Sequence, residues 1–152
     1  MINSIVAGNW KMNKTPKEGK IFIEKMISDL DSLGDTNVII CPPFTGLTSL
    51  LKSNKYNLGA QNCYFEDSGA YTGEISVKML IDCGVKYVIL GHSERRSIFS
   101  EDDISIGKKV KKVLDAGVTP ILCIGETIDQ LNEGLAKETV SAQLNEGLSK
   151  LS

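Results

Sequence analysis

The strongest constraint on the fold is a short apolar run, rich in β-branched residues, that recurs about every 30 residues, the length of one strand–helix–strand unit. The five runs are Ser4–Gly8, Asn37–Cys41, Asn57–Gln61, Tyr87–Gly91 and Thr119–Ile124. They read as continuous apolar stretches, which is typical of parallel strands buried on both faces. The sequence therefore predicts an α/β fold in which helices cover a parallel sheet.

The segment after the first run carries the clearest helix signal. Thr15 can act as the N-cap, Pro16 suits the first helical position, and Glu18 completes a capping box. The apolar residues that follow at helical spacing are Ile23, Met26, Ile27 and Leu30. We expect this helix to end at Gly34, just before the second strand.

The ends of the predicted strands favour a closed barrel over an open, doubly wound sheet. Polar residues and glycines follow each run, where a barrel of this kind carries its active site. No GxGxxG turn or P-loop follows any run, so a nucleotide-binding open sheet has no support. A complete eight-unit barrel takes about 250 residues. This chain has 152 residues and holds five of the runs. One long amphipathic region follows over residues 127–152, with a helical pattern punctuated by Gly134 and Gly147.

Composition excludes several classes of protein. The formal net charge is −2, without the strongly basic surface that nucleic acid requires. No apolar run approaches the ~18 residues of a membrane span, and no basic-then-apolar leader opens the sequence. The four cysteines are widely spaced and do not form a metal-ligand pattern with the single histidine. We therefore expect a cytoplasmic protein with reduced thiols, without a metal site, and with neither nucleic acid nor membrane as a partner.

Two short segments concentrate the residues best suited to chemistry. The single histidine, His92, and the only two arginines, Arg95 and Arg96, lie together after the fourth strand. A histidine at the start of a helix faces backbone N–H groups that disfavour the imidazolium, so a neutral ring can donate to a substrate carbonyl. After the first strand, Lys11 and Asn9 suit an anionic substrate as a point charge and a neutral donor. A solvated loop histidine and a solvated lysine are the alternatives.

The connection from Gln61 to Ser76 is long for a strand-to-helix link. Connections of this length are usually functional or disordered. From the residues alone, a projection toward a partner chain and a disordered tip both remain open.

Five motifs, taken together, resemble the triosephosphate isomerase family. They read GNWKMN at 8–13, GAQN at 59–62, GAYTGEIS at 69–76, GHSERR at 91–96 and CIGET at 123–127. They follow that family's order and spacing, and the resemblance covers the whole chain. It implies the TIM (β/α)8 barrel as the parent fold. Residues 1–152 are then a single incomplete barrel domain of about five strand–helix units, the N-terminal five-eighths of the enzyme.

The resemblance also implies an activity and roles for individual residues. Members of the family interconvert dihydroxyacetone phosphate and D-glyceraldehyde 3-phosphate in glycolysis and gluconeogenesis, as homodimers and without a cofactor. His92 corresponds to the neutral catalytic electrophile, and Lys11 to the cation beside the substrate. Asn9 corresponds to a further substrate-binding residue, and Glu94 to a buried carboxylate paired with Lys11. The residues implied at the subunit contact are Thr72, beside the partner's active site, Glu74 and Arg95.

One part of the family's pattern has no counterpart here. Nothing in residues 1–152 matches the general base, a glutamate after the sixth strand, or the lid and phosphate-binding groups that follow it. Glu126 is the only tempting substitute, and its counterpart in the family has no such role. We therefore expect the chain alone to be inactive as an isomerase. Two alternatives stay open: a catalytically dead piece that binds or complements another subunit, and, with less support, another phosphosugar barrel enzyme.

An arc of five strands has two open edges, predicted here at Ser4–Gly8 and Thr119–Ile124. The side chains expected to face the interior of the barrel include Val88, Leu90, Ile121 and Cys123. In the arc these side chains lack an opposite wall. We therefore expect the isolated chain to be molten, aggregated or assembled edge to edge.

Overall fold

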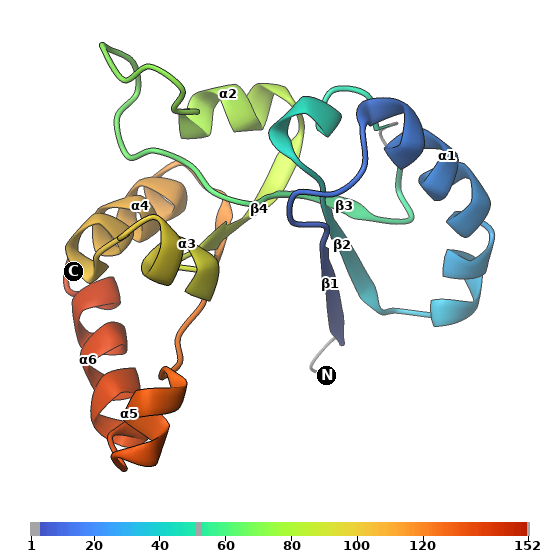
Figure 1. The fold of residues 1–152 in the computed structure, drawn as a ribbon. Coiled ribbons are helices and arrows are strands. Elements are labelled where there is room, and N and C mark those ends of the chain that lie inside the picture. Colours follow the sequence, from blue (N-terminus) through green and yellow to red (C-terminus); the bar gives the residue numbers. More distant parts are fainter. Residues whose placement is uncertain (1–3, 51–52, 152) are drawn as a thin grey trace.

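Five parallel strands form one sheet in the computed structural model, which describes residues 4–50 and 53–151. They are β1 (Ile5–Asn9), β2 (Asn37–Cys41), β3 (Asn57–Ala60), β4 (Val85–Leu90) and β5 (Thr119–Leu122). Each strand pairs with the one before it in the chain, so β1 and β5 are the two ends of the sheet (Figure 1). The predicted α/β fold, an arc of parallel strands, is confirmed, and every predicted run overlaps an observed strand.

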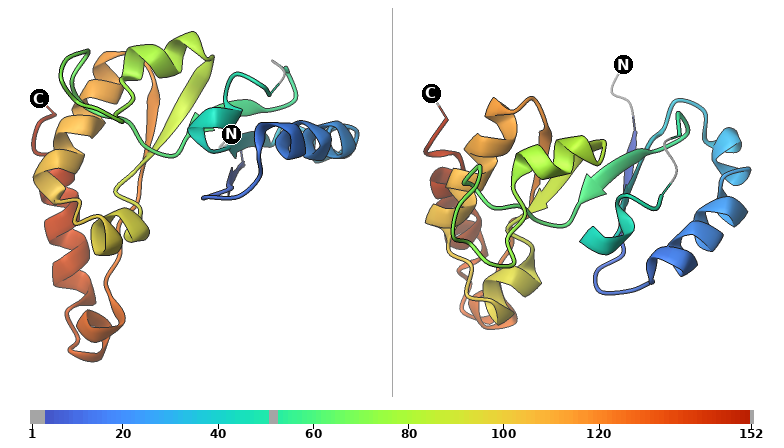
Figure 2. Two further views of the ribbon diagram at one scale, coloured as in Figure 1. Left: turned by 45° about the horizontal axis from the view of Figure 1, so that its top comes forward. Right: turned by 90° about the horizontal axis from the view of Figure 1, so that it is seen from above.

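Helices follow the strands along the chain, and some of them pack against the outer side of the sheet (Figure 2). They are α1 (Pro16–Met26), α2 (Val77–Asp82), α3 (Ser93–Ile98), α4 (Asp103–Asp115), α5 (Ile128–Asn132) and α6 (Ala136–Leu148), with 3₁₀ turns η1 (Asp29–Leu33) and η2 (Phe44–Gly46). The predicted capping box is present, because Thr15 and Glu18 bond to each other's backbone at the start of α1. The predicted end at Gly34 is wrong. The helix stops at Met26 because the Ser- and Asp-rich segment that follows favours a tighter turn, and Gly34 closes that turn instead.

The amphipathic region predicted over residues 127–152 is helical, and of its two glycines Gly134 interrupts the helix whereas Gly147 lies within α6. Gly134 has a φ of 75° and separates α5 from α6. A left-handed residue of this kind ends a helix, and glycine adopts it at little cost. The second helix, α6, then packs closely against α4: a Cβ on Gly107 would lie only 2.8 Å from the carbonyl oxygen of Glu146. Ser152 lies outside the described residues.

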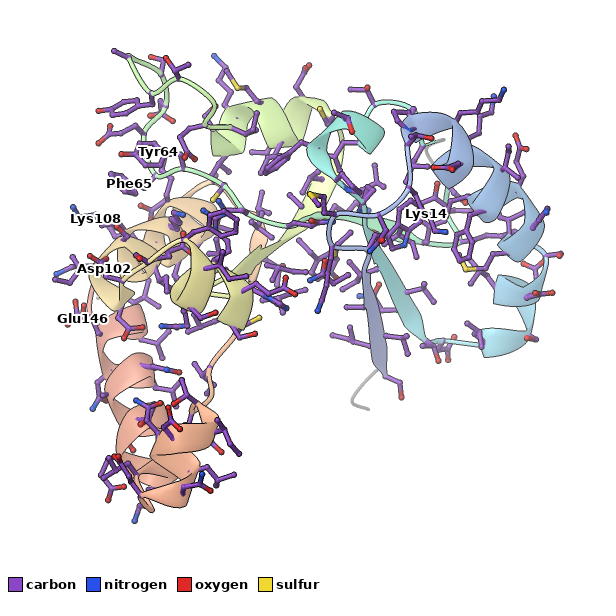
Figure 3. The ribbon with its side chains drawn as sticks, viewed as in Figure 1. Lys14, Tyr64, Phe65, Asp102, Lys108 and Glu146 are labelled. Atoms are coloured by element: carbon purple, nitrogen blue, oxygen red, sulfur yellow. The ribbon has the colours of Figure 1, made fainter. Side chains whose placement is uncertain are left out.

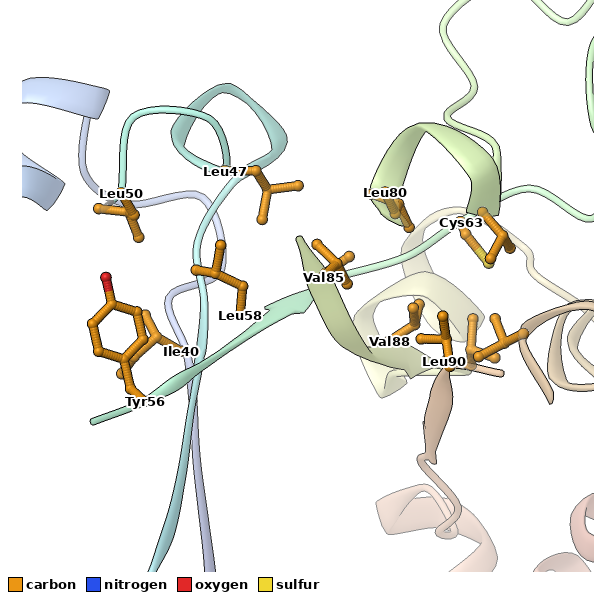
Figure 4. Packing of buried hydrophobic residues seen from close by; sticks show 14 of the residues in the cluster. Ile40, Leu47, Leu50, Tyr56, Leu58, Cys63, Leu80, Val85, Val88 and Leu90 are labelled. Carbon is orange, nitrogen blue, oxygen red and sulfur yellow. The ribbon is translucent and has the colours of Figure 1, made fainter. Parts of the chain in front are cut away.

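Two apolar clusters occupy opposite faces of the sheet. The larger one lies between the sheet and helices α1, α2 and α4, and Figure 4 shows part of it. Val88 and Leu90 belong to this outer cluster, so the prediction that they face the barrel interior is wrong. Ile121 and Cys123 do pack in the inner cluster, with Ile89 and the β2 residues. The error arose because β4 is apolar on both faces, so its sequence shows no alternation that could assign a side.

The long connection after β3 has a defined shape and extends away from the sheet beside α2 (Figure 1). At its base the N–H of Tyr64 donates to the carbonyl oxygen of Ile75 at 2.8 Å, and the rings of Tyr64 and Tyr71 lie 4.8 Å apart. Figure 3 shows Phe65 near Lys108 of α4, whose ammonium lies 5.0 Å from the ring centroid. This arrangement favours a structured projection over a disordered tip.

Among the helices of the described residues, none is both long enough and apolar enough to cross a membrane. The prediction about a leader sequence falls in part on residues 1–3, which lie outside the described residues.

Candidate functional site

The loops at the carboxyl ends of β1, β2, β3 and β4 line a cavity of about 180 Å³. Asn9 and Lys11 come from the end of β1, Gln61 from the end of β3, and His92 and Glu94 from the end of β4. The other lining residues are Met12, Phe44, Asn62, Arg95 and Phe99. The carboxyl ends of parallel strands meet at one edge of a sheet, which is why residues far apart in the chain converge here. The structure thus brings all the predicted substrate-site residues together.

His92 is the N-cap of α3, and its ring is fixed by a local hydrogen bond. The backbone N–H of Glu94 donates to Nδ1 at 3.2 Å, and the imidazole is 22% exposed. A nitrogen that accepts an N–H bond carries no proton, so this geometry favours a neutral ring protonated on Nε2. The Glu94 carboxylate, 3.5 Å from Nδ1, attracts a proton to the same nitrogen. The hydrogen bond from the Glu94 N–H opposes this attraction, because Nδ1 cannot accept that bond while it carries a proton. The ring can therefore offer its Nε2–H as a hydrogen-bond donor.

Lys11 is held in an unusual backbone conformation, with a φ of 52°. This left-handed region is costly for a residue other than glycine, and such strain collects at functional sites. Two side chains stabilise it: the N–H of Lys11 donates to Asn9 Oδ1 at 2.9 Å, and Gln61 Nε2 donates to the Lys11 carbonyl oxygen at 3.0 Å. Gln61 also donates to the carbonyl oxygen of Cys41 at 2.8 Å. The side chains of Asn9 and Gln61 thus fix the backbone of Lys11 at the cavity.

The expected pair between Lys11 and Glu94 is present, with Nζ and Oε1 2.9 Å apart. The hydrogen bond from Lys11 holds the pKa of Glu94 below its ordinary value, assisted by the charge of Lys11 and opposed by partial desolvation. The expectation that Glu94 is buried is wrong, since its side chain is 43% exposed. It lies in the first turn of the short helix α3, at the rim of the open cavity. Solvent therefore screens this ion pair.

A second cavity of about 270 Å³ shares His92 and lies between the ends of β4 and β5. Its lining residues are Gly91, His92, Ser93, Arg96, Cys123, Ile124, Gly125 and Glu126. Gln143 of α6 shapes this wall from behind, because its side-chain amide bonds to both the N–H and the carbonyl oxygen of Gly125, at 2.8 and 3.0 Å. The structure therefore places Glu126 in a cavity wall that also contains His92.

Within residues 4–50 and 53–151, no group of three or more His, Cys, Asp or Glu side chains is arranged to hold a metal ion. All four cysteines are free thiols. Burial raises the pKa of both Cys41 and Cys63 to about 12, so neither is an activated nucleophile.

The family model described as triosephosphate isomerase matches residues 4–152. The chain belongs to the triosephosphate isomerase family. It is 46% identical to triosephosphate isomerase of Natranaerobius thermophilus over 99% of this chain and 60% of that protein. It is 45% identical to the enzyme of Carboxydothermus hydrogenoformans over 98% of this chain and 61% of that protein. The chain therefore spans about 60% of the length of the curated relatives it matches.

A solved structure gives the same result for the fold. The chain superposes on the crystal structure of triosephosphate isomerase from Bartonella henselae with a TM-score of 0.89 and 35% sequence identity. The match covers 99% of this chain and 64% of that one. The arc of five strands is thus part of a triosephosphate isomerase barrel.

The three residues that the family resemblance implies at a subunit contact come from two segments, the long loop after β3 and α3. Thr72 and Glu74 lie in the exposed part of the long loop and do not line the cavity of about 180 Å³. Arg95 does line that cavity, and its Nε lies 3.2 Å from Oε2 of the buried Glu101.

Sequence reasoning missed the residues that support the site from behind. Gln61 and Arg96 bond to backbone carbonyls of other strands or loops, and no sequence pattern marks such acceptors. A third case was detectable. Lys109 is 4% exposed and bonds to Glu101 and to Asn62 of the cavity wall. It interrupts the apolar stripe of α4 (Ile106, Val110, Val113), and a lysine in a buried stripe signals a polar network.

Proposed function

We propose that the protein containing this chain is a triosephosphate isomerase, which interconverts dihydroxyacetone phosphate and D-glyceraldehyde 3-phosphate in glycolysis and gluconeogenesis. We place it in the cytoplasm, as a homodimer that works without a cofactor, with Thr72, Glu74 and Arg95 at the subunit contact. The observation that carries the proposal is His92, held with Nδ1 as an acceptor in a cavity it shares with Lys11.

The proposed mechanism assigns each side chain one task. The Nε2–H of His92 donates to the carbonyl oxygen of the substrate and stabilises the negative charge that forms on it in the enediolate. The Lys11 ammonium attracts the anionic substrate, Asn9 lines the same wall, and Glu94 holds Lys11 in place. A carboxylate base takes the proton from one carbon and returns it to the next.

We further propose that residues 1–152 alone do not isomerise triose phosphates. The family's base is a glutamate after the sixth strand, whereas residues 4–50 and 53–151 form five strands. Loss of a general base typically costs about 10²–10⁴-fold in rate. Glu126 does not replace it in this proposal, although it lies in a cavity wall with His92.

The runner-up is a catalytically inactive piece that binds or complements another chain. The exposed edge of the sheet supports it, since Ile5 and Val6 of β1 are 60% and 56% exposed. An unpaired strand of this kind is a template for a further strand.

The test uses an extended protein, in which residues 1–152 continue into the part of the C. hydrogenoformans relative beyond the matched region. A coupled assay should find turnover in the extended protein and none in residues 1–152. His92→Gln should lower kcat by about 100-fold, in line with the loss of an oxyanion donor. Lys11→Met should raise KM and lower kcat, because it removes the cation beside the substrate.

Lys17→Met is the matched control, because Lys17 lies exposed on α1, away from the cavity. Its turnover should equal that of the parent. Turnover by residues 1–152 at the level of the extended protein, or an active His92→Gln variant, contradicts the proposal. If separate pieces regain activity only on mixing, the complementing role of residues 1–152 is supported as well.

A further inference from the structure

Arg96 joins three elements behind the histidine. Its Nε donates to the carbonyl oxygen of Gly91 at 2.7 Å, and its Nη2 donates to the carbonyl oxygen of Cys123 at 3.2 Å. Its Nη1 lies 2.5 Å from Oδ1 of Asp103, the first residue of α4. The side chain is 16% exposed. One rigid, planar guanidinium therefore ties the ends of β4 and β5 to the start of a helix.

The backbone beside this guanidinium has little freedom. Gly91 has a φ of 67°, where the chain turns sharply between β4 and His92. A Cβ on Gly91 would lie 2.9 Å from Arg96 Nη2 and 3.2 Å from the carbonyl oxygen of Cys123. The glycine is thus required both for its left-handed conformation and for close contact with the arginine.

The guanidinium of Arg96 already bonds to three groups of the protein. The Asp103 carboxylate offsets its charge, and two N–H groups are directed at backbone oxygens. Charge-assisted hydrogen bonds of this kind are stronger than neutral ones. The peptide that leads into His92 is therefore held through the Gly91 carbonyl oxygen, in addition to the bond that the Glu94 N–H makes to Nδ1 of the ring.

We propose that Arg96 is a positioning residue for His92. By holding the Gly91 carbonyl beside that of Cys123, Arg96 sets the place and direction of the imidazole over the cavity. The inference rests on the proposed function for the role of His92. It differs from a direct role in substrate binding, in which the guanidinium itself would contact the anionic substrate.

The experiment compares Arg96→Lys with Val113→Ala in the extended protein. Lysine keeps the charge but loses the fork that bonds two carbonyls, so kcat should fall by about 10- to 100-fold while KM changes less than about twofold. Val113 is fully buried on α4 and away from both cavities, so its truncation weakens the fold without touching His92. That control should keep its kcat. Asp103→Asn retains the Oδ1 acceptor and should show a smaller loss of kcat. If Arg96→Lys does not fold, the kcat of Asp103→Asn tests the positioning role instead.

A spectroscopic readout separates positioning from general stability. Residues 1–152 contain a single histidine, so ¹⁵N-histidine labelling of this segment before ligation to the unlabelled remainder reports on His92 alone. The parent should show one tautomer, protonated on Nε2, and Arg96→Lys should show a mixture. Val113→Ala should match the parent.

Two results overturn the inference. One is a parent-like kcat and histidine spectrum in both Arg96→Lys and Asp103→Asn. The other is a raised KM with unchanged kcat, which indicates direct contact with the substrate. If the parent extended protein shows no isomerase activity, the proposed function fails, while the tautomer comparison still tests the positioning role.

Discussion

At the scale of single residues, the pKa of Glu94 depends on its neighbour Lys11. Its pKa is lowered by the hydrogen bond from Lys11 and by nearby positive charge. A carboxylate with a lowered pKa adds stability above its unfolded value of about 4.3, and this stability is lost as pH falls through the folded value. Lys11→Met should therefore raise the pKa of Glu94 and make stability less sensitive to acid, as ¹³C titration of the carboxyl group can measure.

Glu18 is the internal control for that titration. Its pKa is lowered chiefly by a hydrogen bond from the Thr15 backbone, and Lys11 takes no part in it. The pKa of Glu18 should therefore be equal in the parent and in Lys11→Met. An unchanged pKa of Glu94 would show that the ion pair does not persist in solution.

The cysteines should differ in reactivity according to burial. Cys41 and Cys63 are almost fully buried, and burial raises the pKa of each to about 12, so they stay protonated. Cys83 is more accessible. In the extended protein, Ellman's reagent at about pH 8 should therefore modify Cys83 well before Cys41 and Cys63, and all three should react in denaturant. Rapid modification of Cys41 in the native protein would contradict this order.

At the scale of elements, the crossing of α4 and α6 leaves no room for a side chain at Gly107. Alanine favours a helix over glycine by about 1 kcal/mol. A Cβ here, however, meets the Glu146 carbonyl oxygen at 2.8 Å, and backbone cannot move aside as a side chain can. Gly107→Ala should therefore destabilise the extended protein by about 1–3 kcal/mol in urea denaturation.

Gly147→Ala is the matched control on the partner helix. Its Cβ would meet only the tip of Leu122, Cδ2 at 3.2 Å, which can rotate away. The helix preference of alanine then offsets the crowding, and stability should change by less than about 1 kcal/mol. Equal losses for the two variants would show that the helices separate easily.

How far the elements could be predicted depended on whether the signal was local. The start of α1 was predictable because Thr15 and Glu18 bond to each other within one turn. The face of the sheet on which Val88 of β4 packs could not be predicted, because it depends on where α4 and β5 lie. The pairing between β3 and β4 also shifts register at Leu58 and Gly59, which the sequence of either strand does not reveal.

The same division applies to the site. Lys11 and His92 each follow a strand, and parallel strands end at one edge, so their meeting was predictable. The exposure of Glu94 was not, because it depends on how the cavity opens. The hydrogen bonds from Gln61 and Arg96 could not be predicted either, because their acceptors are backbone carbonyl oxygens, which every residue carries.

At the scale of the whole molecule, the two ends of the sheet are unpaired in the described residues. Residues 1–152 alone should therefore self-associate in sedimentation velocity experiments, because exposed strand edges pair with other chains. Val6→Lys should reduce the association, since it places a charge on the exposed edge strand β1. Ile21→Lys adds the same charge on α1 and should not. A monodisperse monomer with protected amides in both β1 and β5 would contradict the prediction.

The pairing of each strand with its predecessor also bears on how the chain is made. During translation β1 leaves the ribosome first. When each later strand emerges, the preceding strand with which it pairs has already been synthesised. After β1, which pairs once β2 has been made, no strand in this arc has to wait for a partner encoded further along before it can join the sheet. The order of translation and the order of assembly therefore coincide, and the growing end of the sheet is always the part most recently made.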